Sequence, residues 1–177
     1  MFAITANRLT AIQRASRALR VFFIFISVIF VLGTLNRMTH PFPPGARTLA
    51  GFVFQGTAIT AKIQILWLVQ IVSGAALNLK ILYHFIRLMG LFSKGKLFTA
   101  PNVAQLRQVG LTFLCAPAVW LVVLIGVTPE IAAAQYQWVK VMSSFPGGAL
   151  ISGCVFLFAS RIMNEGRELR DEQDLVV

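Results

Sequence analysis

The polar residues whose spacing could do chemistry lie within an otherwise apolar segment, residues 63–79. Gln70 and Asn78 are eight residues apart with Gly74 midway between them, so in a helix they would share one face. Ser73 would lie beside them. Surrounded by apolar groups, such amides and hydroxyls either hydrogen-bond to a neighbouring helix or line a pocket for a polar ligand. We keep both interpretations for Gln70, Ser73 and Asn78.

The other residues with reactive side chains do not form a catalytic or metal-binding pattern. His40 and His84 have no acid or cysteine near them in the sequence. Cys115 and Cys154 lie inside apolar blocks, without the spacing of a metal-binding pair. The chain also lacks the motifs of phosphate-binding loops, nucleophile elbows and zinc-binding helices. We therefore predict that the protein is not an enzyme and uses no metal or other cofactor.

Composition indicates what kind of element must position these residues. Of the 177 residues, 57% are hydrophobic and 12% are charged, about half the charged share of a soluble domain. The apolar residues lie in four blocks nearly free of charge, each close to the roughly 17 to 25 residues that cross a bilayer. A soluble chain of this size could not bury four such blocks. The sequence therefore predicts an all-α integral membrane protein with four transmembrane helices.

Span boundaries follow from the apolar blocks and from the prolines, glycines and charges between them. We place the four spans at residues 18–35, 63–79 with a helical extension to about 91, 109–127 and 145–161. The predicted connections are outer loops at 36–62 and 128–144, a cytoplasmic linker at 92–108 and a cytoplasmic acidic tail at 162–177. Together these segments form a single four-helix membrane domain, 1–177.

The distribution of charge predicts which way the spans run. Positive residues mark the cytoplasmic side of membrane proteins. Twelve of the 16 Lys and Arg residues lie before or at the start of the first span, between the second and third spans with the helical extension included, or at and after the end of the fourth. Because an even number of spans also returns the chain to its starting side, we predict that both termini are cytoplasmic and carry helical extensions there.

Local patterns predict further structure around the spans. Residues 49–56, LAGFVFQG, are apolar for a loop and could lie on the membrane surface, cap the bundle or form a lid over a ligand. Thr128 followed by Pro129 is typical of a helix start, and Thr99 is a second expected N-cap in the linker. Small residues four apart within 148–153 predict close helix contact, in the bundle or in a homo-oligomer.

The acidic tail is unexpected in a chain whose formal net charge is +10. Five of the six acidic residues fall in the last thirteen positions: Glu165, Glu168, Asp171, Glu172 and Asp174. Arginines four residues before three of these acids stabilise a helix only weakly and do not explain the clustering. A basic surface would explain it, either the chain's own segments at 14–20 and 94–107 or a basic partner. The residues expected at such a cytoplasmic contact are Lys94, Lys96, Arg107, Glu168, Asp171, Glu172 and Asp174.

Two stretches carry a family resemblance: KGKLFTAPNVAQLRQVG, residues 94–110, and NEGRELRDEQDLVV, residues 164–177. As a pair they resemble a bacterial family of small four-span membrane proteins known as a domain of unknown function. Leu97 departs from that family, in which many relatives have proline at this position. Some members are encoded beside a small helix-turn-helix regulator, so the resemblance implies a membrane partner for a transcription factor.

These patterns and the resemblance favour a regulatory or interaction protein in the bacterial cytoplasmic (inner) membrane. We predict that its cytoplasmic face engages a protein partner, such as a small DNA-binding regulator, without binding nucleic acid directly. No Asp or Glu lies in a span core, which argues against proton-coupled transport. The alternative is a small membrane transporter, channel or ligand-binding protein that uses the polar face of span two.

Overall fold

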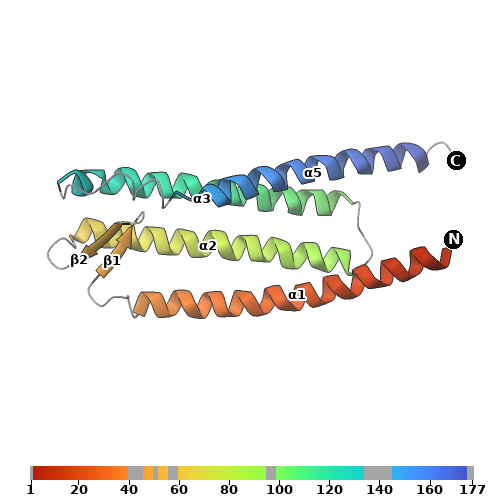
Figure 1. Ribbon diagram of the computed structural model, residues 1–177, viewed down its shortest axis with the longest axis horizontal. Helices are drawn as coiled ribbons and strands as arrows, with labels where there is room; N and C mark the ends of the chain where they lie inside the picture. The colour runs from red at the N-terminus through yellow and green to blue at the C-terminus, as the bar shows by residue number, and fades with distance from the viewer. Residues whose placement is uncertain are drawn as a thin grey trace.

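The computed structural model of the chain describes residues 2–39, 46–49, 52–55, 60–94, 99–133 and 145–174. Within these residues the elements are long helices and a small hairpin (Figure 1): α1 Phe2–Thr39, β1 Ala46–Leu49, β2 Phe52–Gln55, α2 Ala61–Phe92, α3 Ala100–Ala133 and α5 Gly147–Asp174. Each helix contains a stretch long and apolar enough to cross a membrane: Thr10–Thr39, Ala61–Phe92, Ala100–Pro129 and Gly147–Leu169. The predicted class, an all-α membrane protein with four spans, is confirmed, and the hairpin is a small addition to it.

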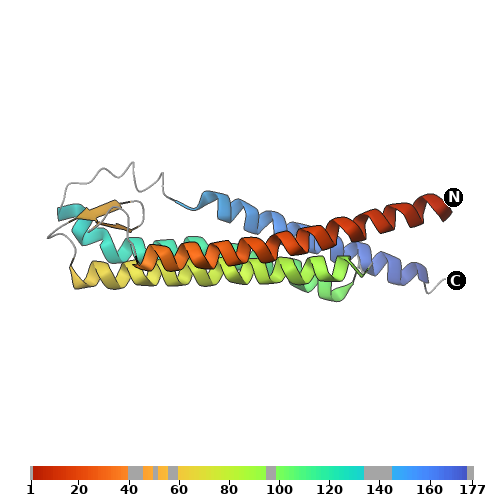
Figure 2. The ribbon, with the colours of Figure 1, turned by 90° about the horizontal axis from the view of Figure 1, so that it is seen from below.

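The four helices run side by side, and each is antiparallel to the next along the chain (Figures 1 and 2). Helix α2 packs against α1 and α3, and α3 also packs against α5. Both chain ends therefore lie at one end of the bundle, which we call the terminal end; the hairpin lies at the opposite loop end. At the terminal end, α1 and α5 extend beyond the end of α2 and the start of α3 (Figure 2).

Large apolar side chains cover the outside of the helices. Phe25, Ile125 and Phe158 are 63%, 71% and 67% exposed, respectively. Leaving such side chains in water costs about 1.5–3 kcal/mol each relative to burying them, whereas lipid tails are as apolar as the side chains themselves. Among the described residues, the exposed large apolar side chains other than Phe145 lie within the four membrane-crossing stretches, so they form the surface expected of a protein in lipid.

A row of phenylalanine rings connects all four helices. Phe23 of α1 stacks on Phe85 of α2, with ring centroids 5.2 Å apart. Phe85 meets Phe156 of α5 edge to face at 5.5 Å, and Phe156 stacks on Phe113 of α3 at 5.7 Å. Such pairs contribute about 0.5–1.5 kcal/mol each beyond the area that they bury. The row therefore links α1, through α2, to the α3–α5 pair.

Glycines bring the backbones of α3 and α5 into direct contact. A Cβ placed on Gly153 would lie 2.8 Å from the side chain of Leu114 and 3.0 Å from the carbonyl oxygen of Gly110. A Cβ on Gly110 would likewise lie 3.0 Å from the carbonyl oxygen of Gly153. The close contact expected from the small residues in 148–153 is therefore present at Gly153. Gly148 has open space at its Cβ position, and the partner glycine is one that the sequence pattern did not single out.

Helix α3 is longer than expected, because it joins the linker helix, the third span and the start of the second outer loop. The prediction that Thr128 begins a new helix is wrong, since α3 continues to Ala133. Pro117 and Pro129 both lie inside α3. The Thr128 hydroxyl donates a hydrogen bond to the Leu124 carbonyl at 2.8 Å. A hydroxyl in an apolar segment finds its acceptor one turn back in its own helix, so here it does not cap a new one.

Threonines do precede α2 and α3. Thr60 is the N-cap of α2, and its hydroxyl accepts a hydrogen bond from the Ile63 amide at 3.4 Å. Thr99 precedes α3, and its carbonyl accepts hydrogen bonds from the amides of Asn102 and Val103 at 2.9 and 3.2 Å. Its hydroxyl is buried and has no hydrogen-bond partner among the residues that the structure describes. Thr99 therefore occupies the expected N-cap position without capping through its side chain.

The hairpin packs on the loop end of the bundle, against α2 and α3. Its strands pair antiparallel, from Ala46 opposite Gln55 to Leu49 opposite Phe52. Leu49 is fully buried in a cluster with one residue of α2 and two of α3: Ile63, Val123 and Val127. Of the three interpretations of residues 49–56, the structure favours a cap on the bundle for the part that it describes.

Candidate functional site

Two of the three polar residues predicted to share a face of span two line a groove between α1 and α2. This α1–α2 groove has a volume of about 470 Å³. Gln70, Gly74 and Asn78 line it from α2, and Thr34 and Arg37 are among the residues that line it from α1. Because the helices are antiparallel, Arg37 lies near the loop end of the groove and Asn78 lies towards the terminal end. The groove therefore combines a cation, amides and a hydroxyl with apolar walls.

The absence of side chains at two glycines widens the α1–α2 groove. A Cβ built on Gly33 or Gly74 would meet no atom within 4 Å. Asn78 donates from Nδ2 to the Gly74 carbonyl at 2.8 Å, and the Thr34 hydroxyl donates to a carbonyl of its own helix at 2.9 Å. Ser73 lies outside the lining, and its hydroxyl donates to a backbone carbonyl of α2. The hydrogen bonds of these three side chains therefore stay within their own helices.

Nearer the terminal end, a buried polar pair joins α2 to α3. His84 Nδ1 lies 2.6 Å from Oε1 of Gln105, and both side chains are buried. Because a carbonyl oxygen can only accept, Nδ1 of His84 carries the proton in this arrangement. The edge of the neighbouring Tyr83 ring packs on the imidazole at 5.4 Å. This geometry fixes the ring and joins the two helices, and no acid or nucleophile is part of it.

Sequence reasoning treated His84 as a packing residue and did not single out Gln105. A signal for Gln105 exists in the spacing of the linker helix. Asn102, Gln105, Val109 and Thr112 recur every three or four residues, which places them on one helical face. All four are buried. Because three of them are polar, hydropathy alone does not mark the face as buried.

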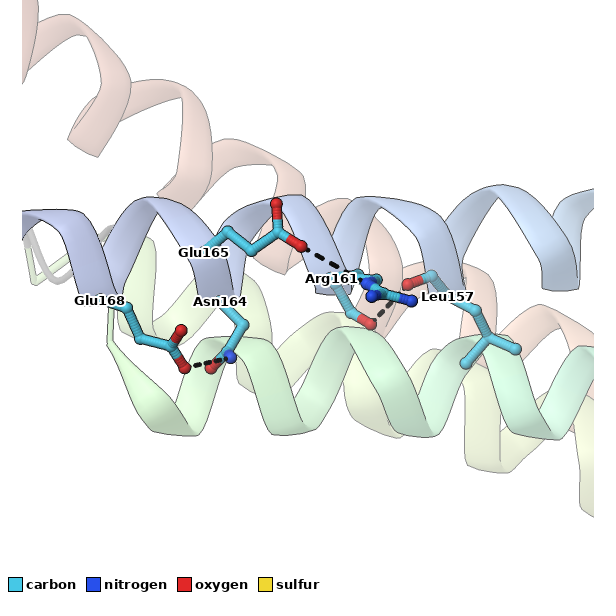
Figure 3. A network of polar contacts seen from close by, with 6 residues as sticks. Leu157, Arg161, Asn164, Glu165 and Glu168 are labelled. Carbon is cyan, nitrogen blue, oxygen red and sulfur yellow. Dashed lines mark hydrogen bonds and ion pairs between the residues drawn. The ribbon is translucent and has the colours of Figure 1, made fainter.

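The acidic residues of the tail lie on the last turns of α5, at the terminal end of the bundle. Glu165 accepts a hydrogen bond from Arg161 Nε at 3.4 Å, and Glu168 accepts one from Asn164 Nδ2 at 2.7 Å (Figure 3). Asp171 Oδ2 lies 4.0 Å from Arg167 Nε. Exposed pairs of this kind contribute about 0.2–0.5 kcal/mol each. We call the exposed acids of this segment the acidic face: Glu165, Glu168, Asp171 and Glu172.

Among the described residues, the acidic face is not paired with the basic segments 14–20 and 94–107. Both ion pairs in the part of the chain that the structure describes are within α5. Of the other residues expected at a cytoplasmic contact, Lys94 is exposed just after α2 and Arg107 is exposed on α3. Lys96 and the side chain of Asp174 lie outside the described residues. The structure therefore gathers Glu168, Asp171 and Glu172 on one surface.

Neither surface has the geometry of a metal centre. Within the residues that the structure describes, no three His, Cys, Asp or Glu side chains lie close enough together to hold a metal ion. Cys115 and Cys154 are both free and face outward from the bundle. Two candidate sites therefore remain: the α1–α2 groove and the acidic face.

The chain matches a known family over nearly its whole length. The family described as "Protein of unknown function (DUF2975)" matches residues 5–177. The chain belongs to this family. Its membership confirms the resemblance inferred from the linker and the tail, and the four membrane-crossing helices make it a multi-pass membrane protein. No curated protein and no solved structure matches the chain.

Proposed function

We propose that this member of the family is a regulatory protein whose terminal end faces the cytoplasm and holds a basic protein partner. The partner class that fits best is a small helix-turn-helix DNA-binding regulator, and the membrane would be the bacterial inner membrane. The observation that carries the proposal is the acidic face, whose described partners all lie on α5 itself.

The chemistry of the acidic face suits a basic partner. Its carboxylates lie within two turns of α5, and the pairs that they make within the helix are long or exposed, so they cost little to exchange. DNA-binding domains carry basic surfaces that contact phosphates. A carboxylate surface competes for the same side chains, so a regulator bound to the membrane would be held away from DNA. Such charge complementarity also makes association fast and dependent on salt.

Continuity of α5 offers a route from the membrane to the partner. The helix runs without a break from Gly147 in the span to Asp174 in the tail. Its contact with α3 at Gly110 and Gly153 is backbone to backbone, so a rearrangement there would reposition the acidic face. In this mechanism, a change of state in the membrane part releases the partner by moving or tilting α5.

Co-purification from native membranes tests the proposal. Neutralising the acidic face removes four exposed charge interactions of about 0.5 kcal/mol each, which predicts about thirtyfold weaker retention of the partner. The variant is Glu165→Gln, Glu168→Gln, Asp171→Asn and Glu172→Gln. The matched control, Arg14→Gln, Arg17→Gln and Arg20→Gln, changes charges on α1 at the same end and should retain the partner. Equal retention by both variants, or no cytosolic partner at any salt concentration, would contradict the proposal.

The α1–α2 groove favours a second candidate function, a ligand-binding or transport protein. This candidate requires that water reach the groove. In a chain with Cys115→Ser and Cys154→Ser, a cysteine introduced by Gly74→Cys should then react with a water-soluble thiol reagent. Val72→Cys is the control and should not react, because Val72 is two residues from Gly74, on the other side of α2, and is 53% exposed. Equal protection of both cysteines would exclude an aqueous groove.

A further inference from the structure

A second groove lies at the terminal end, between the first turns of α3 and the part of α5 that lies beside them. It has a volume of about 470 Å³. Val103, Arg107, Gln108 and Leu111 line it from α3, and Asn164 and Arg167 line it from α5. No described acid is part of this lining, although the acidic face is on the same helix. We call it the α3–α5 groove.

The α3–α5 groove is a site of concentrated positive charge with an unmet donor. It is lined by two guanidinium groups, one from each helix. Nε of Arg167 is buried and has no hydrogen-bond partner among the described residues. Oδ2 of Asp171 is 4.0 Å away, which is beyond hydrogen-bond distance. Because Nε itself is closed to solvent, a ligand with oxygen acceptors would bind through the rest of the guanidinium group, whose side chain is 29% exposed.

Other features of the α3–α5 groove also favour a negatively charged ligand. The amino-terminal residues of α3 line it, starting with Ala100, so the positive end of the helix dipole lies beside it. Gln108 is exposed and contributes an amide that can donate. Arginine binds phosphate oxygens through two parallel hydrogen bonds, and two arginines on opposite walls can hold one phosphate from both sides.

We propose that the α3–α5 groove binds a phosphate group. Two sources carry that chemistry: the headgroup of an anionic lipid and a soluble phosphate. The apolar part of the lining favours the lipid, because Leu111 lies one turn beyond Arg107, towards the apolar length of α3. A lipid would place its phosphate between Arg107 and Arg167 and an acyl chain along Leu111. None of the described acids of the acidic face lines this groove, although Arg167 of the groove lies 4.0 Å from Asp171 of that face.

Lipid retention by the purified full-length protein tests this inference. In native mass spectrometry, the protein in detergent should retain phosphatidylglycerol in preference to phosphatidylcholine. The double variant Arg107→Gln with Arg167→Gln should lower that retention about tenfold or more, because both charge-assisted contacts are lost. Arg161→Gln is the matched control, since Arg161 is on the same helix, is 82% exposed and lies outside the groove. It should retain phosphatidylglycerol as the unmodified chain does.

A second experiment distinguishes an anionic lipid from a soluble phosphate as the source of the phosphate group. Inorganic phosphate, titrated calorimetrically against the lipid-free protein, should bind weakly in both the unmodified chain and the Leu111→Gln variant. If the lipid is the ligand, Leu111→Gln should weaken the retention of phosphatidylglycerol and leave the binding of inorganic phosphate unchanged. Binding of inorganic phosphate that needs both arginines, without preference for phosphatidylglycerol, would assign the site to a soluble phosphate.

Folding of the variants is checked by size-exclusion chromatography. If the double variant is not monodisperse, Arg107→Gln and Arg167→Gln are compared singly with Arg161→Gln, and each should lower retention. The proposal is overturned if neither probe distinguishes the folded groove variants from Arg161→Gln. Equal retention of phosphatidylglycerol and phosphatidylcholine, with no phosphate binding, would overturn it as well.

Discussion

The glycine contact between α3 and α5 gives the sharpest test of how the bundle is held together. In Gly153→Ala, the added Cβ would lie 2.8 Å from Leu114 and 3.0 Å from the carbonyl oxygen of Gly110. The Leu114 side chain can rotate away, but the carbonyl oxygen belongs to the backbone. The two helices must therefore separate by a few tenths of an ångström, and overpacking of this kind costs about 1–3 kcal/mol.

The intrinsic helix preference of alanine opposes this cost. Replacing a helical glycine by alanine is favourable by up to about 1 kcal/mol. Gly74→Ala is the matched control, because Gly74 is also inside a membrane-crossing helix and its Cβ would meet no atom within 4 Å. The difference between Gly153→Ala and Gly74→Ala therefore isolates the contact, and we expect Gly153→Ala to be less stable by about 1–3 kcal/mol.

Unfolding in mixed micelles with increasing dodecyl sulfate, followed by circular dichroism, measures these free energies. The double variant Gly110→Ala with Gly153→Ala adds a further check. Once the helices have separated for one added Cβ, the second meets less resistance, so the double variant should lose less than the sum of the single losses. If Gly153→Ala is as stable as Gly74→Ala, the helices do not meet at this point and the α3–α5 packing described above is wrong.

Three further predictions concern the polar pair, the aromatic row and the long third helix. Gln105→Leu leaves the buried Nδ1–H of His84 without an acceptor and should cost about 1–3 kcal/mol in the same unfolding assay; adding His84→Leu should recover part of that loss. Phe156→Ala removes the ring that connects two others and should cost about 3–5 kcal/mol, whereas Phe158→Ala, whose side chain is exposed to lipid, should cost less. Thr128→Ala should change stability by less than about 1 kcal/mol, because the hydroxyl bonds within α3 and does not cap a helix; a larger loss would restore Thr128 as an N-cap.

The membrane class and its spans could be predicted because lipid imposes a strong and local rule. Each crossing segment must be long and apolar, and that property is visible in one stretch of sequence at a time. The ends of helices are harder to predict from the sequence. Thr128 and Pro129 have the residue types of a helix start, yet α3 continues through them, because an apolar helix accommodates both a proline and a hydroxyl that bonds to Leu124. The hairpin was missed because its strands have only four residues each.

The sites depend on contacts between distant parts of the chain, and spacing alone does not reveal these. Gln70 and Asn78 could be placed on one face, but the opposite wall of their groove comes from α1. His84 and Gln105 are 21 residues apart and on different helices. The α3–α5 groove likewise needs arginines from the linker and the tail, which the sequence presented as separate basic segments.

Helix α5 combines three of these features in one rigid element. Gly153 fixes it against α3, Arg167 lines the α3–α5 groove, and Asp171 belongs to the acidic face. Asp171 is eighteen residues beyond Gly153, or about 27 Å along the helix axis. A tilt of about 10° at the glycine contact would therefore displace Asp171 by about 5 Å, which is more than an ion pair tolerates. Binding of a phosphate by Arg107 and Arg167 would oppose that tilt, because it joins α3 to α5 about 21 Å from the pivot. If the two proposals hold together, Arg107→Gln with Arg167→Gln should weaken partner retention without changing any residue of the acidic face; unchanged retention would show that the groove and the face act separately.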